Sequence, residues 1–148
     1  MSRAPLLFLR RAKMYEITRR SKIKEVLAVN NADGSKAFEV PVEINVDAFV
    51  GRWNKARVAL AEAQADLQAD KTDAKAQRYG ESVIALMRLV FGDDGAEKLI
   101  DFYAKDYTEM LLDVFPFIAD RIVPQVNAAT DERVKQLKKA AGIVGKRI

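Results

Sequence analysis

The sequence predicts a mostly α-helical fold with an N-terminal β-hairpin, followed by a helical hairpin and a small helical bundle. Between about residues 21 and 45, β-branched and polar residues alternate on either side of a turn that contains Asn and Gly. From residue 47 onward, apolar residues recur every three or four positions, as on one face of a helix. The 148 residues, 49% hydrophobic and 31% charged, suffice for one core. We therefore expect a hairpin over residues 14–46 packed with a helical domain over residues 47–141.

The two ends of the chain are basic. Residues 1–30 carry eight Lys or Arg against two Glu, residues 133–148 carry six basic residues and no acidic one, and the segment between them is acidic. Such ends are either solvated or contact an acidic surface, which could be nucleic acid, a partner or the middle of a second copy. Residues 1–13 contain four consecutive apolar residues, too few for the roughly 7 to 15 of a secretory signal. We interpret residues 1–13 as a disordered extension or tag and residues 142–148 as a flexible basic tail.

The hairpin is predicted by a turn between two strand-like segments. The turn, Asn30 to Ser35, contains Asn and Asp-Gly, which supply the positive φ of a tight reversal. Pro41 cannot donate to a strand ladder, so the second strand should lie at an edge or break there. Two strands are marginally stable alone. The hairpin must therefore pack on helices or pair with another chain, for which the edge from Phe38 to Ile44 is a candidate.

A helical hairpin follows. Asp47 is predicted to cap a helix whose apolar residues recur at spacings of four and three up to Leu67. Residues 70–73 interrupt this spacing and contain a Thr and an Asp that can cap a second helix, which runs to about Val90. The short connection predicts two antiparallel helices in contact.

The turn from Gly92 to Gly95 is predicted to end this second helix and to begin a short one over residues 96–104. A glycine can take the left-handed conformation that ends a helix, and an Asp can begin the next. The two Asp in the turn suggest calcium, but an EF-hand loop spreads its ligands over about 12 residues and ends in a bidentate Glu. Residues 96–103 do not provide that pattern, so we interpret the turn as a helix cap.

The C-terminal helices are predicted from proline and threonine. Pro116 should kink or break a helix near Phe115, because it lacks an N–H and its ring collides with the preceding turn. Pro124 should end that helix. Thr130 is a cap signal for a last helix over residues 131–141, whose acidic start and basic end suit the helix dipole.

Residues 107–123 carry more apolar bulk than one helical face can bury. A helix that is apolar all round lies in a core, in a membrane or against a partner, and this one is too short and too often charged to span a bilayer. We predict partner contacts here, with a core role as the alternative for each residue. The primary residues are Leu111, Leu112, Phe115, Phe117, Ile118 and Ile122, and the secondary ones are Phe49 and Trp53.

The chain contains no His and no Cys, which excludes Ser-His and Cys-His catalysis, thiolate nucleophiles and Cys-based zinc sites. Carboxylates near residues 101–113 are interpreted as a solvated face. We therefore predict no catalytic residue, no metal and no cofactor, and a protein that is not an enzyme; an enzyme that uses only carboxylates, Lys or Tyr is the third alternative. Nucleic acid is an alternative partner, bound by Arg19, Arg20, Lys22 and Lys24, although the acidic helical region argues against it.

Several local sequences resemble a known family. They are the Val42–Asp47 step at the end of the hairpin, a charged helix that opens with Phe49 and Trp53, the Phe91–Gly95 turn, and LLDVFPFI from Leu111 to Ile118. In this order they resemble the small tail assembly chaperones of long non-contractile-tailed (siphovirus-type) bacteriophages.

The resemblance covers about residues 14–140. It implies a small, mostly helical, self-associating protein of the host cell cytoplasm, without enzymatic activity or cofactor and without a membrane-spanning segment. Its partner would be the long, hydrophobic, helical tape measure protein, which it would keep soluble until the tail tube polymerises. A shallow apolar surface of modest affinity, offered by many copies, suits such a client.

Overall fold

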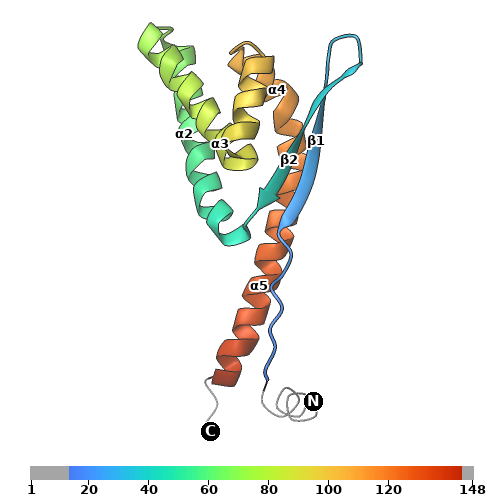
Figure 1. The fold of residues 1–148 in the computed structure, drawn as a ribbon. Coiled ribbons are helices and arrows are strands. Elements are labelled where there is room, and N and C mark those ends of the chain that lie inside the picture. The colour runs from blue at the N-terminus through green and yellow to red at the C-terminus, as the bar shows by residue number, and fades with distance from the viewer. Residues whose placement is uncertain (1–13, 145–148) are drawn as a thin grey trace.

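The computed structural model describes residues 14–144 and confirms the mostly helical fold with an N-terminal two-stranded hairpin. Figure 1 shows a body made of the hairpin and the helices that follow it, from which the C-terminal helix projects. The predictions for residues 1–13 and for the end of the basic tail, residues 145–148, lie outside the described residues.

Strands β1 (Ile23–Asn30) and β2 (Lys36–Ile44) form an antiparallel pair. At the turn, Gly34 takes a φ of +88°, and the carboxylate of Asp33 accepts hydrogen bonds from the Oγ and the N–H of Ser35 at 2.6 and 2.9 Å. These bonds hold the pKa of Asp33 below its usual value. Pro41 faces Val26 with no register shift. The described sheet has only two strands, so β2 lies at an edge, which is the first of the two predicted alternatives.

One face of the hairpin packs on helix α3 (Asp73–Phe102). Val40, Val42 and Ile44 of β2 are each at most 2% exposed. The absence of a side chain at Gly95 permits close approach, because a Cβ there would lie 2.8 Å from Cγ1 of Val40. The expectation that the hairpin needs helices for support is met by this contact.

Helices α2 (Val46–Ala69) and α3 form the predicted helical hairpin. The cap of α2 is Asn45, two residues before the predicted Asp47, and Asn45 makes no side-chain capping hydrogen bond. Thr72 caps α3 as predicted, accepting a hydrogen bond from the N–H of Lys75 at 3.3 Å. The break predicted at Gly92 is confirmed, because this residue takes φ +75° and ψ 172° within α3.

Helix α4 (Tyr107–Phe117), a π-helical turn η1 (Ile118–Ile122) and α5 (Val123–Val144) form one run without the predicted ends. Pro116 lies inside α4, and Pro124 is the second residue of α5 rather than the end of a helix. The π turn explains how the run continues past Pro124: the N–H of Val123 reaches the carbonyl of Ile118, five residues back, and the widened turn relieves the clash that Pro124 would cause.

Thr130 lies inside α5 and does not cap a helix. Its Oγ1 is buried without a hydrogen-bond partner. The cap prediction was wrong because the signal at one residue is outweighed by the helix on both sides, which the core contacts of Ile122 and Val126 hold in place. Since α5 continues to Val144, helix also replaces the first three residues of the predicted flexible tail.

The core lies between the hairpin, the α2–α3 pair and the α4–η1–α5 run. Five residues at spacings of four carry the run into the core, each at most 3% exposed: Met110, Val114, Ile118, Ile122 and Val126. Beyond them, α5 leaves the body and has the N-terminal segment beside it (Figure 1). Arg20 Nη2 donates to Oε1 of Gln136 at 2.5 Å across this contact. We call residues 14–22 and 131–142 together the stalk.

Candidate functional site

The predicted partner-contact residues divide into two groups in the structure. Ile118 and Ile122 are 0% exposed and Phe49 is 4% exposed, so all three belong to the core of the subunit. The prediction that they contact a partner was wrong in this structure. The hairpin, α2 and α3 together enclose more of the 107–123 helix than its apolar content suggested.

The other predicted residues reach the surface. Leu112 is 70% exposed, and Leu111 and Phe115, on the same side of α4, are half-buried. The ring of Phe115 stacks on half-buried Trp53 of α2, with centroids 6.2 Å apart. We call Leu111, Leu112, Phe115 and Trp53 the α4 face. Phe117 is also half-buried but stacks on the buried ring of Phe91, at 6.1 Å, and so points away from this face.

The hairpin edge offers little apolar side chain to a partner. Val40, Val42 and Ile44 are buried, and the ring of Phe38 packs edge-on against Phe102 at 5.5 Å. Pairing of β2 with another chain would use its backbone, and it stays a prediction.

The stalk exposes apolar side chains that are not among the predicted partner-contact residues. Tyr15 and Ile17 are 90% and 87% exposed, and Leu137 is 68% exposed, three residues after half-exposed Val134. The spacing of Val134 and Leu137 is visible in the sequence as an i, i+3 pair, but the charged residues around the pair give no signal of a binding surface.

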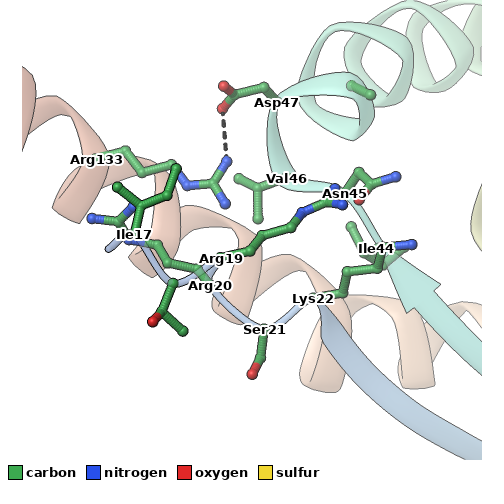
Figure 2. A pocket seen from close by; sticks show the side chains of 12 residues that line it. Ile17, Arg19, Arg20, Ser21, Lys22, Ile44, Asn45, Val46, Asp47 and Arg133 are labelled. Carbon is green, nitrogen blue, oxygen red and sulfur yellow. Dashed lines mark hydrogen bonds and ion pairs between the residues drawn. The ribbon is translucent and has the colours of Figure 1, made fainter. Parts of the chain in front are cut away.

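A basic cleft lies where the stalk joins the body. It has a volume of about 680 Å³ and is lined by residues 17–22, by the junction of β2 and α2 at residues 44–48, and by Arg133 of α5. Figure 2 shows Arg19 extending from the N-terminal segment toward the start of α2, and Arg133 extending from α5 toward Asp47. The structure thus brings three of the predicted basic residues, Arg19, Arg20 and Lys22, together with a fourth that is distant in sequence.

The charges in the cleft are unbalanced. Asp47 is its only lining carboxylate among the described residues, and it pairs with Arg133 at 3.3 Å. Within residues 14–144, no ion pair engages Arg19, Arg20 or Lys22, and the recorded hydrogen-bond partner of Arg20 is the neutral Gln136. The uncapped start of α2 places the positive end of that helix dipole at the same cleft.

Lys24 lies on an adjoining hollow rather than in the cleft. This hollow, about 310 Å³, is lined by Arg19, Arg20, Ser21, Lys22, Lys24 and Glu43. Glu43 pairs with Lys24 at 3.6 Å, and both side chains are exposed. The predicted basic series therefore continues from the cleft along the start of β1. Arg133 escaped prediction because more than a hundred residues separate it from the others, and only the path of α5 brings it there.

One polar contact outside the cleft joins Tyr103 to Asp113 of α4. The hydroxyl of Tyr103 donates to the carboxylate of Asp113 at 2.9 Å, and burial together with this contact raises the pKa of Tyr103 to about 12.

Among residues 14–144 there is no group of three or more Asp or Glu placed to hold a metal ion. No helix of the described chain combines the length and the hydropathy needed to cross a membrane.

Comparison of the chain with protein-family models, with curated proteins and with solved structures gave no match. The resemblance to tail assembly chaperones therefore stays a prediction.

Proposed function

We propose that this chain is a tail assembly chaperone of a long non-contractile-tailed phage, which binds the hydrophobic, helical tape measure protein and keeps it soluble in the host cytoplasm. The observation that carries the proposal is the α4 face. Leu112 is 70% exposed on it, although the same helix buries Met110 and Val114 fully in the core. A rigid helix thus holds a large aliphatic side chain in water, beside a half-buried Phe-Trp stack.

The shape of this face suits a long client. The half-buried aromatic pair provides a flat floor and Leu112 a projecting side chain, which together match the apolar stripe of an amphipathic helix. Full burial of a leucine contributes about 1.5–3 kcal/mol, so one copy would hold one segment of client with modest affinity. Many copies along one client would bind strongly together yet could be displaced singly as the tail tube polymerises.

The charges around the face bear on client choice. Glu109 and Asp113 lie on the same helix as Leu112, and both are exposed. Carboxylates at the rim favour a client helix whose apolar stripe is bordered by Lys or Arg, and they disfavour pairing with another acidic surface. This reduces direct contact between the α4 faces of two copies.

Self-association belongs to the same proposal, and the stalk is its candidate surface. Val134 and Leu137 lie three residues apart on a helix that has left the body, and Ile17 is exposed on the neighbouring segment. A second copy could cover these side chains by packing its own stalk alongside, as amphipathic helices do.

Co-expression with a tape measure segment tests the function. The wild-type chain should keep the segment in the soluble fraction, and Leu112→Asp should lower its affinity for the segment at least about tenfold, because a charge replaces buried apolar area. Val58→Asp is the matched control, since Val58 is 47% exposed on α2, away from the α4 face. The more obvious variant, Phe117→Asp, discriminates poorly because Phe117 stacks on the core ring of Phe91.

Circular dichroism should show that both variants fold. Retention of client binding by Leu112→Asp, or equal loss in Val58→Asp, would remove the α4 face from the proposal.

A further inference from the structure

We propose that the basic cleft at the base of the stalk binds the phosphate backbone of single-stranded nucleic acid. This activity would be separate from client binding, because the cleft is formed by the N-terminal segment, the start of α2 and α5, and includes no residue of the α4 face.

The charge of the cleft is the first step of the inference. Arg19, Arg20, Lys22 and Arg133 converge on one concavity, and Asp47 is the single carboxylate among its lining residues. Cations that repel one another raise the free energy of a folded surface unless an anion or solvent compensates them. Of these four cations, only Arg133 forms an ion pair with another described residue, so the other three remain for an external anion.

The kind of cation indicates phosphate. Three of the four are arginines, whose planar guanidinium can donate two parallel hydrogen bonds to one phosphate. Ser21 and Asn45 add neutral polar groups to the lining, and neither supplies a charge that would repel a polyanion. A site of this composition neutralises a backbone rather than reading base edges.

The arrangement along the chain indicates an extended ligand. Arg20, Lys22 and Lys24 are alternate residues leading into β1, and alternate residues of an extended chain lie about 6.6 Å apart. The cleft passes into the second basic hollow, which Lys24 lines, so the positive surface continues beyond a single phosphate. A strand of several nucleotides can follow this surface.

An aromatic side chain completes the pattern. Tyr15, 90% exposed, precedes the cleft residues on the same segment, and Ile17, which lines the cleft, is 87% exposed. Proteins that bind single strands without sequence preference combine a basic groove with exposed aromatic rings on which bases stack. An acidic peptide or a lipid headgroup would occupy the cations but would leave such a ring unused, and a bilayer would meet the concave cleft poorly.

The test is fluorescence anisotropy of a labelled single-stranded oligothymidylate with the full chain. Binding through three phosphate contacts, one for each unpaired cation of the cleft, predicts a slope of about −2.1 for log K against log salt, and hence a loss of roughly 18-fold between 50 and 200 mM salt. The triple variant Arg19→Gln/Arg20→Gln/Lys22→Gln should lower the affinity at least tenfold at low salt and reduce the slope toward zero.

The control removes the same charge elsewhere. Arg57→Gln/Lys71→Gln/Lys98→Gln takes three exposed cations from α2, the α2–α3 connection and α3, none of which lines the cleft. This variant should bind within about twofold of the wild type. Both triple variants keep the basic residues of segment 1–13, so any binding by that segment cancels in the comparison.

Two single variants sharpen the assignment. Asp47→Asn removes the carboxylate that competes for Arg133 and should tighten binding, whereas Asp94→Asn, exposed on α3, should not. Tyr15→Ala should weaken binding about tenfold without changing the salt slope, because stacking releases no counterions.

The proposal is overturned if both triple variants lose affinity equally, or if the wild-type chain binds anionic phospholipid vesicles or a poly-glutamate peptide but not the oligonucleotide. Client binding by the cleft triple variant should be unchanged, and the Leu112→Asp variant should bind the oligonucleotide normally. Failure of one proposal is therefore distinguishable from failure of the other.

Discussion

The α4–η1 segment and the stalk part of α5, residues 131–142, differ in how far they expose their apolar side chains. The first has many and buries most of them, whereas the second has few and exposes them. Residues 107–123 are rich in large apolar side chains, yet most of these lie in the core or half-buried around it. Residues 131–142 contain few, and the largest of them, Leu137, is 68% exposed. The difference lies in the neighbours. The hairpin, α2 and α3 surround the first segment, whereas the second has the N-terminal segment beside it and touches the body through the ion pair of Arg133 with Asp47.

This comparison teaches that an apolar run locates a core more reliably than a binding surface. The functional candidates are apolar residues that remain exposed where tertiary contacts are few, such as Leu112 and Leu137, and not the densest part of the run.

The largest expected effect comes from truncating the core side of the run. Ile118→Ala should lower the free energy of unfolding by about 2–5 kcal/mol, since Ile118 is 0% exposed and its removal leaves a cavity. Leu137→Ala in the stalk should change it by less than about 0.5 kcal/mol in the monomer. Urea unfolding at low protein concentration measures both. A small effect at Ile118 would mean that the run does face a partner, as first predicted.

Two glycines should respond with opposite signs. Gly95→Ala should destabilise the fold by about 1–3 kcal/mol, because its Cβ would meet Cγ1 of buried Val40 at 2.8 Å and Cβ of Phe91 at 3.1 Å. Gly142→Ala meets no atom within 4 Å on the stalk helix and should stabilise that helix by up to about 1 kcal/mol. Thermal melts of the two variants compare a glycine of the body with a glycine of the stalk. A shift of both Tm values in the same direction would contradict the prediction.

Thr130 marks the boundary between the two regions. Thr130→Val should raise the free energy of unfolding by about 1 kcal/mol, because it replaces a buried hydroxyl that lacks a hydrogen-bond partner with a methyl group of similar size. Thr108→Val is the matched control, since the Thr108 hydroxyl lies 3.0 Å from that of Tyr79 and its loss should destabilise. Urea unfolding of both variants measures the difference. Destabilisation by Thr130→Val would indicate that its hydroxyl is satisfied.

The smallest expected effect is a pH dependence in the body. Because the pKa of Tyr103 is raised from 10.0 to about 12, folding favours the neutral phenol, which donates to Asp113. Its stabilisation is complete below pH 10 and is lost as the pH rises from 10 toward 12. Urea titrations from pH 8 to 11 should show a steeper loss of stability above pH 10 in the wild type than in Tyr103→Phe. Parallel curves would show that Tyr103 is not the group responsible.

Local signals predicted the first half of the fold. The Asp-Gly turn fixed the hairpin, the four-three spacing up to Leu67 predicted α2, and Thr72 and Gly92 act on α3 as a cap and a break, as expected. The second half was predicted less well. Pro124 and Thr130 are signals for a helix end and a helix cap, but a π-helical turn before Pro124 and core contacts on both sides keep the helix continuous through them. Neither the π turn nor these core contacts can be predicted from the local sequence.

The candidate surfaces were predictable in unequal measure. Leu112 was named from the sequence together with residues that proved to be core, because periodicity cannot show which side of an all-apolar helix is covered. Ala104 and Lys105, which end α3 with positive φ values of 51° and 65°, gave no glycine or asparagine signal. Arg133 joined the basic cleft through the path of α5, which no local pattern encodes.

Hydrogen exchange with and without a tape measure segment tests most directly whether the exposed apolar residues hold a client. In the free protein, amides of α4 and η1 should exchange slowly and those of the stalk helix quickly, because few contacts hold the stalk. Added client should slow exchange around residues 111–115 while leaving the outer face of α2 near Val58 unchanged. An unchanged exchange pattern at residues 111–115, with the client demonstrably bound, would contradict the account.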